Sequence, residues 1–231
     1  MNSFENRPGL IGYKQALQLS LDHVRVMPEE TCLTMESLGR VASREIKAVV
    51  NLPSNNSSLK DGYALKSADI QWASPSNPVL LKVDGTCHAG QESSVEIVSG
   101  KAVRVMSGAT IPKGADAVLA EEFSEFENGV VKVVADSHVG RNILWVGSDI
   151  RCGETLLNRG ELITPSKAAL LAAGGIMSLS LVKLPEIGLV ATGDEIALLG
   201  KPLRAGMVYA SNVALQQAWL SSHGIGCNVE I

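Results

Sequence analysis

The stretch GLVATGDE at residues 188–195 joins a short apolar run to a sharp polar turn. The run from Ile187 to Ala191 ends in a glycine-containing loop, which is typical of a strand in a parallel sheet covered on both faces. A helical pattern follows at about residues 211–223, and a second short strand is predicted at residues 227–231. This order predicts the start of a βαβ unit, whose ligand site lies at the carboxyl end of the first strand.

The βαβ unit is incomplete, because a parallel sheet needs more strands than the residues after 187 supply. We therefore expect this chain to be part of a longer protein. Its 231 residues are 45% apolar and 19% charged, an ordinary globular composition that suffices for two or more modest domains. Aromatic residues make up only 4%, so core packing must rest on aliphatic side chains.

Charge and cysteine usage argue against several classes of protein. The net charge is −4 without a long basic run, which disfavours a dedicated nucleic-acid surface. No stretch reaches the roughly 18 apolar residues of a membrane span, and the N-terminus has no apolar targeting segment. The four cysteines form no C-x-x-C pair, so we expect reduced, mostly buried thiols in a cytoplasmic protein.

The first part of the chain alternates helix and strand signals. Apolar residues from Gly12 to about Arg25 follow helical spacing and predict an amphipathic helix whose apolar stripe faces a core or a partner. β-favouring residues at 31–35 and 41–50 predict two strands joined by a short helical turn. A polar loop at residues 54–58, rich in Asn and Ser, marks the first domain boundary.

Residues 61–137 carry short strand signals separated by turn residues, without a long helical pattern. The Asn128-Gly129 pair between apolar residues is a strong sign of a β-hairpin. This region therefore predicts a small all-β domain, a barrel or sandwich of short strands. The strands are expected at residues 78–83, 95–98, 102–106, 117–119 and 130–134.

Mixed character returns after the β region. Residues 140–160 are irregular, Thr164 and Pro165 then mark a helix start, Gly174-Gly175 its end, and residues 178–182 a strand. Because segments of mixed character flank the β region, we interpret it as an insertion into a discontinuous domain. The predicted fold class is α+β and multidomain, with a discontinuous α/β domain at residues 10–54 and 139–186, an inserted all-β domain at residues 55–138, and the start of a further α/β domain at residues 187–231.

Acidic and small residues beside turns are the candidates for chemistry. Asp61 precedes a Gly-Tyr pair in a loop, Ser107 and Gly108 end a predicted strand, and Asp149 lies in a glycine-rich loop. Taken alone, each of these also fits a plain turn or a solvated carboxylate. The run Thr192–Glu195 is a stronger candidate, because paired carboxylates at the carboxyl end of a strand can hold Mg²⁺ beside substrate phosphates. A helix cap or turn cluster is the open alternative there.

Several short motifs occur in a fixed order along the chain. They are DGYA at 61–64, RVMSGA at 104–109 with IPKGADAV at 111–118, GSDI at 147–150, TGDE at 192–195, and Asn212. In this order and spacing the chain resembles the MoeA family, the molybdopterin molybdenumtransferases, whose animal relative is the E domain of gephyrin. The resemblance extends over nearly the whole chain.

The resemblance implies an architecture that agrees with the interpretation above. It implies that the discontinuous domain is elongated, and that residues 187–231 begin a truncated α/β domain that binds molybdopterin. A pterin-binding loop and a C-terminal β domain would follow in a missing part, so the chain alone is expected to be inactive. The resemblance also implies a homodimer with the active site between the third domain of one subunit and the second domain of the other.

The implied activity is a step of molybdenum cofactor biosynthesis. Molybdenum from molybdate enters adenylylated molybdopterin with the help of Mg²⁺, and AMP is released. By matching position, Asp149 and Glu195 are the expected catalytic and metal-binding residues, which position the pyrophosphate for cleavage. Other proteins of cofactor biosynthesis are possible partners besides the pterin nucleotide. The expected substrate-binding residues are Asp61, Ser107, Gly108, Thr192, Gly193, Asp194 and Asn212.

Departures from the family pattern leave a second function open. Asn56 replaces an acidic residue, the stretch Leu144–Val146 stands where arginines are usual, and Ser148 replaces a glutamate. Arginine suits bidentate contacts with oxyanions, so these changes weaken an anion-binding role. The alternative is a non-catalytic paralogue that keeps the dimer fold and acts as a binding or scaffold protein. Retention of Asp149 and Glu195 favours the enzyme.

Overall fold

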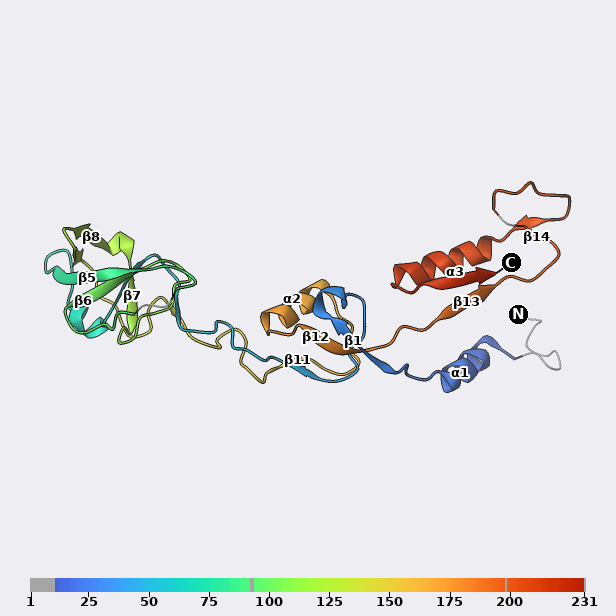
Figure 1. Cartoon of the computed structure of the whole chain (residues 1–231), viewed down its shortest axis with the longest axis horizontal. Helices are drawn as coiled ribbons and strands as arrows, with labels where there is room; N and C mark the ends of the chain where they lie inside the picture. The colour runs from blue at the N-terminus through green and yellow to red at the C-terminus, as the bar shows by residue number, and fades with distance from the viewer. Residues whose placement is uncertain (1–10, 92–93, 198, 231) are drawn as a thin grey trace. The chain divides into compact units, whose positions relative to one another are not determined.

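The structure is a computed structural model that describes residues 11–91, 94–197 and 199–230. The chain divides into two compact units. The first comprises Met1–Glu45, Leu157–Ala168 and Ser178–Ile231, and the second Ile46–Leu156 and Ala169–Met177. Helices and strands occur together (Figure 1), which confirms the mixed α+β class. Within the described residues, no helix combines the length and the apolar character that a membrane crossing requires.

Helix α1 (Tyr13–His23) opens the described part of the chain and contains no buried residue. Tyr13, Leu17 and Leu21 recur at every fourth position, so they share one face of the helix, and all three are exposed. The predicted helix is confirmed. Its apolar stripe is left uncovered by the described residues of this chain.

An antiparallel pair forms part of the first unit. Strand β1 (Glu29–Leu33) pairs with β12 (Ser178–Val182), and the 3-10 turn η1 (Thr34–Glu36) follows β1. Leu181 on β12 is fully buried. The predicted strand at residues 178–182 is confirmed, and the one at 31–35 is shifted toward the N-terminus.

The strand predicted at residues 41–50 is wrong for most of its length, because the backbone changes partners there. Ala42 forms an isolated bridge with Leu181, while β2 (Ile46–Lys47) pairs with β11 (Thr155–Leu157). Other amide groups of the segment bond to different partners, since the N–H of Ser43 donates to Ser180 in β12 and that of Val49 to Gly174 after α2. The β-favouring composition indicates extended backbone, but it does not specify which strand the segment pairs with.

Helix α2 (Pro165–Ala173) is fixed at both ends by the residues that predicted it. The hydroxyl of Thr164 accepts a hydrogen bond from the N–H of Lys167 at 3.4 Å and caps the N-terminus. At the other end Gly175 has φ of +82°, and its N–H and the next one donate back to carbonyls of the last helical turn. This Schellman motif favours glycine because φ is positive.

A six-stranded sheet forms the centre of the second unit. Its order is β7 (Ala117–Ala120), β4 (Gly62–Leu65), β6 (Lys101–Val105), β5 (Val79–Cys87), β9 (Val130–Val133) and β8 (Ser124–Glu127). All neighbours are antiparallel except β5 and β6. Tyr63 and Leu65 enter one core cluster and Ala64 and Val103 the other, so both faces are covered. The predicted barrel or sandwich takes the form of one curled sheet (Figure 1).

Turn chemistry predicted the hairpin in this sheet, whereas apolar pattern over-predicted one strand. Asn128 and Gly129 join β8 to β9 with φ of +50° and +79°, as a two-residue hairpin turn requires. The strand expected at residues 95–98 is wrong. Ile97 is buried and its N–H donates to the carbonyl of Lys113 at 2.8 Å, but no ladder forms. The apolar pattern there indicates burial, not pairing with another strand.

The βαβ order predicted for the end of the chain is confirmed. Strand β13 (Ile187–Val190) lies parallel to β16 (Cys227–Glu230), and α3 (Ser211–Ser222) connects them, while Ile231 lies outside the described residues. The expectation that β13 is covered on both faces is wrong, because its residues are half-buried or exposed. Two strands and one helix supply too little surface to cover both faces. The short parallel pair β14 (Ile196–Ala197) and β15 (Val208–Tyr209) was not predicted.

Gly62 provides a direct test of the sheet. A Cβ atom at this position would overlap the carbonyl oxygen of Leu119 and lie 2.9 Å from the Cα of Ala120. We expect Gly62→Ala to lower the free energy of unfolding by about 3 kcal/mol, because the obstructing atoms are backbone. Urea denaturation followed by circular dichroism measures it. The control Gly188→Ala, where a Cβ meets nothing within 4 Å, should change stability by less than about 0.5 kcal/mol. Equal midpoints for the two variants would contradict the close packing at Gly62.

Candidate functional site

Two of the expected site residues meet at one end of the curled sheet. Asp61 precedes β4 and Ser107 follows β6, and the register pairs Gly62 with Val105, which brings these two ends together. The Asp61 carboxylate accepts a hydrogen bond from the Ser107 N–H at 2.6 Å. The carbonyl of Asp61 also accepts one from the N–H of Glu121 at 3.0 Å. The start of β4 is therefore tied to the strands on both sides.

A polar pocket of about 370 Å³ opens at this point. Three carboxylates and one ammonium group face it, together with the exposed Ser107. Such a set can bind a polar ligand through the hydroxyl and the ammonium group, while the carboxylates hold backbone donors or a cation. The lining residues are Leu59, Lys60, Asp61, Ser107, Glu121 and Glu122. Gly108, with φ of +79°, continues the turn, and its N–H donates to the carbonyl of Ser58 at 2.8 Å.

A buried tyrosine and an ion pair lie next to this pocket, and Glu121 belongs to both the ion pair and the pocket lining. Tyr63 is 3% exposed, and Arg104, opposite it in the register, pairs with Glu121 at 3.0 Å. Burial raises the pKa of the Tyr63 hydroxyl, Arg104 opposes this effect and Glu121 adds to it. Sequence reasoning missed Arg104 and Glu121 as site residues. Their signal was the position of each at a strand end next to a motif residue.

Asp149 lies on another segment of the same unit. Its N–H donates to the carbonyl of Leu52 at 3.0 Å, and its neighbour Ile150 forms a bridge with Leu52. The Asp149 side chain is exposed and does not line the Asp61 pocket. The structure therefore brings Asp61, Ser107 and Gly108 together, but does not add Asp149 to that pocket.

The predicted acidic turn follows β13 in the other unit. Gly193 has φ of +146°, and a Cβ atom built there would lie 2.6 and 2.7 Å from the two carboxylate oxygens of Glu195. The Glu195 carboxylate thus folds over the bare glycine. Thr192 and Asp194 are exposed, as is Asn212 in the first turn of α3. The backbone angle favours glycine at 193, whereas the flexible Glu195 carboxylate can move away from an added Cβ atom.

The departures from the family pattern have definite structural consequences. The side-chain carbonyl of Asn56 accepts a hydrogen bond from the N–H of Val146 at 2.9 Å, a contact that an aspartate would also make. The change to Asn56 therefore removes a charge and keeps a loop contact. Trp145 and Val146 are about half exposed, and the indole of Trp145 lies against Gly140. Apolar surface replaces the expected cations here.

The cysteines and the side chains that can bind metals form a second group of reactive residues. Across the described ranges, no group of three or more His, Cys, Asp or Glu residues is placed to hold a metal ion. The four cysteines are free, but only Cys87 is buried, so the expectation of mostly buried thiols is wrong. Burial raises the pKa of the Cys87 thiol. Cys152 is exposed because it lies in a turn rather than in a core element.

Comparison with known proteins agrees with these motifs. The family described as the MoeA N-terminal region (domain I and II) matches residues 11–175, and the chain belongs to this family. The molybdopterin molybdenumtransferase of Haemophilus influenzae is 34% identical over 178 residues, which cover 77% of this chain and 43% of that protein. The enzyme of the same name from Bacillus subtilis is 36% identical, covering 79% and 44%. The expected resemblance is confirmed, and the chain spans under half the length of these two relatives.

A solved structure supports the same fold. The molybdopterin biosynthesis MoeA protein of Pyrococcus horikoshii OT3 superposes with a TM-score of 0.85 at 29% sequence identity. The match covers 96% of this chain and 60% of that one. The fold of the chain is therefore that of MoeA proteins.

The hydrogen bond between Asp61 and Ser107 can be tested in the chain itself. We expect Asp61→Ala to destabilise the fold by about 1 kcal/mol, since a hydrogen bond to a charged group is lost at an exposed position. Amide hydrogen exchange at Ser107 should accelerate. The isosteric control Asp61→Asn retains a carbonyl acceptor and should keep most of the protection. Equal exchange rates in wild type and Asp61→Ala would show that this contact does not hold the turn.

Proposed function

We propose that this chain is the N-terminal part of an enzyme of molybdenum cofactor biosynthesis. The enzyme inserts molybdenum from molybdate into adenylylated molybdopterin and releases AMP. The observation that carries the proposal is the Asp61–Ser107 contact beside a polar pocket, in a chain whose matched relatives are named molybdopterin molybdenumtransferase. A substrate with a pyrophosphate link needs donors for its anionic oxygens, and this end of the sheet offers the Ser107 hydroxyl and the Lys60 ammonium group, beside carboxylates that can hold a cation.

The roles of the residues follow from their chemistry. Asp61 holds the Ser107 turn, so that the hydroxyl of Ser107 and the ammonium group of Lys60 bind oxygen atoms of the substrate. Thr192, Asp194 and Asn212, with the turn at Gly193, contribute substrate contacts from the α/β part of the enzyme. Asp149 and Glu195 are the proposed catalytic carboxylates. Glu195 is suited to this role because Gly193 leaves space for its carboxylate.

We propose that Mg²⁺ assists this reaction. This ion keeps several waters and usually takes one or two protein carboxylates beside substrate phosphates, so it does not need a cage of three side chains. Exposed Asp149 and Glu195 are the residues that would hold it. When bound, the ion would supply positive charge to the pyrophosphate. The two carboxylates would hold the ion and so set its position beside the phosphates.

Assembly and location form a second part of the proposal. We propose that the chain has three domains, at residues 10–54 with 139–186, at 55–138 and at 187–231. We propose a homodimer, which the uncovered apolar stripe of α1 supports, and the native mass of the purified protein tests it. Free thiols support a cytoplasmic location, which cell fractionation tests.

One observation favours the alternative of a non-catalytic binding or scaffold protein. Exposed Trp145 and Val146 occupy positions where the family usually has arginines. An apolar surface there suits a protein partner better than an oxyanion. Both functions use the same fold, so the activity of the protein decides between them.

Glu195 is the residue on which the enzyme proposal is tested. The intact mass of the protein from its own cells first identifies the natural polypeptide, and that polypeptide is assayed for AMP release from adenylylated molybdopterin with molybdate and Mg²⁺. We expect Glu195→Gln to lower the rate by about 100-fold or more, because a charged catalytic group is lost. Glu230→Gln, an exposed glutamate on β16, should retain the rate.

Two results would count against the proposal. Unchanged AMP release in Glu195→Gln would remove Glu195 from the site. If the wild-type polypeptide binds the pterin nucleotide but releases no AMP, the enzyme proposal is wrong and the scaffold function is favoured.

A further inference from the structure

A cavity in the first unit lies apart from every residue discussed as a catalytic or substrate-binding candidate. Its volume is about 400 Å³, which falls within the size range of small-molecule sites. Its walls come from four segments, at residues 25–27, 39–42, 159–160 and 182–185. They are the chain after α1, the segment after η1, the loop before α2, and the end of β12 with the chain that follows.

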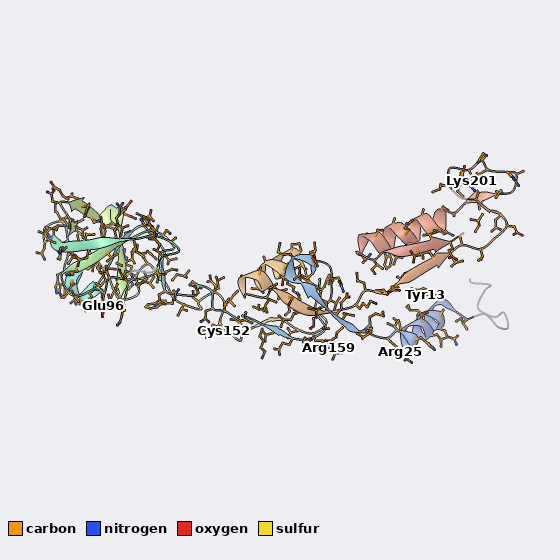
Figure 2. All side chains as sticks on the ribbon, viewed as in Figure 1. Tyr13, Arg25, Glu96, Cys152, Arg159 and Lys201 are labelled. Atoms are coloured by element: carbon orange, nitrogen blue, oxygen red, sulfur yellow. The ribbon has the colours of Figure 1, made fainter. Side chains whose placement is uncertain are left out.

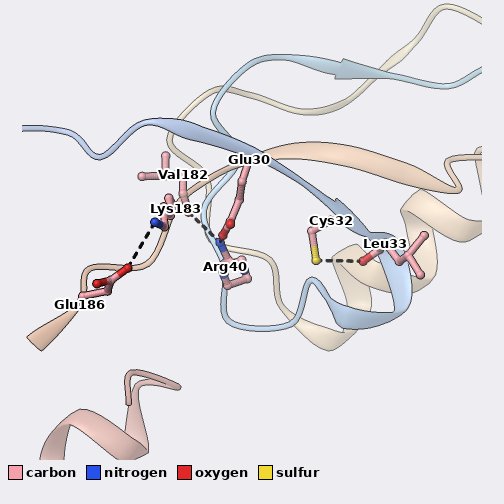
Figure 3. Close-up of polar contacts among 7 residues, drawn as sticks. All are labelled: Glu30, Cys32, Leu33, Arg40, Val182, Lys183 and Glu186. Atoms are coloured by element: carbon pink, nitrogen blue, oxygen red, sulfur yellow. Dashed lines mark hydrogen bonds and ion pairs between the residues drawn. The ribbon is translucent and has the colours of Figure 1, made fainter. Parts of the chain in front are cut away.

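Four cations line this cavity, and two of them have carboxylate partners. Arg40 pairs with Glu30 and donates to the carbonyl of Val182 at 3.0 Å, and Lys183 pairs with Glu186 at 3.4 Å (Figure 3). The Nε of Arg40 is buried and has no hydrogen-bond partner in the described part of the chain. A buried donor in this state carries an energetic cost that a ligand oxygen can remove.

The other two cations are surplus positive charge. Arg25 and Arg159, both labelled in Figure 2, form no ion pair with any described residue and are exposed. None of the described residues that line the cavity is acidic. The cavity therefore offers charge for an anion that the chain itself does not neutralise.

The remaining lining is apolar, which narrows the class of ligand. Val26, Met27, Val41, Leu184 and Pro185 form most of the walls. An apolar pocket with a few convergent polar groups is the usual form of a site for an organic molecule rather than for a bare inorganic ion. Guanidinium groups both pair with phosphate or carboxylate and stack on aromatic rings.

We propose that this cavity binds an aromatic organic anion of the size of a nucleoside monophosphate. The anionic group pairs with Arg25 and Arg159, while the ring lies against the apolar walls. This site is separate from the Asp61 pocket and from the acidic turn at Glu195, and it does not depend on the proposed reaction.

AMP serves as the probe, and calorimetric titration of the chain measures its binding. We expect saturable binding that Arg25→Gln and Arg159→Gln each weaken about tenfold, the effect of losing one charge-assisted contact. Arg204→Gln, an exposed arginine of the same unit outside the cavity, is the matched control and should bind like wild type. Both cavity variants should fold, because their side chains have no partner among the described residues.

Comparison ligands and a second control separate this site from others. Adenosine and inorganic phosphate should each bind at least about tenfold more weakly than AMP, because each lacks one half of the recognition. Glu230→Gln, an exposed residue outside the cavity, should leave AMP binding unchanged. Absence of saturable binding, affinity unaffected by Arg159→Gln, or phosphate binding as tightly as AMP would overturn the proposal. Loss of AMP binding in Asp61→Asn alone would also overturn it, because AMP would then bind in the Asp61 pocket. If Arg159→Gln changed only the native mass of the protein, the proposal would be wrong and the cavity would be an interface between copies of this chain.

Discussion

The second unit depends on the close pairing of β4 with strands on both sides. All four residues of β4 are buried, and Gly62 has backbone atoms of Leu119 and Ala120 where its side chain would be. This spacing fixes the register with β6 and β7, and the register in turn carries Asp61 to the Ser107 turn. A functional contact between residues far apart in sequence thus follows from a backbone constraint in the core.

Local chemistry predicted the elements whose causes are local. Thr164 and Gly175 marked both ends of α2, and Asn128-Gly129 marked a hairpin, because caps and tight turns depend on a few adjacent residues. The error at residues 95–98 has the opposite cause. Whether an extended apolar segment joins a ladder depends on a partner elsewhere in the chain, and composition does not identify that partner.

The candidate site divides in the same way. Asp61 and Ser107 stood out as turn residues in the sequence, but their hydrogen bond arises only from the pairing of β4 with β6. Arg104 was missed because its importance comes from facing Tyr63 across the sheet, and Glu121 because its importance comes from pairing with Arg104. Asn56 shows a further limit, since its amide keeps the bond to Val146 while the family's charge is lost. A substitution at one position can therefore keep the geometry of a loop while it removes the side-chain charge that would face a ligand.

The bare glycine beneath Glu195 has an evolutionary consequence. Every amino-acid replacement at position 193 introduces a side chain where the carboxylate now lies. A replacement at this codon therefore displaces the flexible carboxylate and strains the turn at a φ of +146°, even if the codon for Glu195 is untouched. In a duplicated lineage, the identity of residue 193 therefore bears on where the acid lies, which the presence of Glu195 alone does not report.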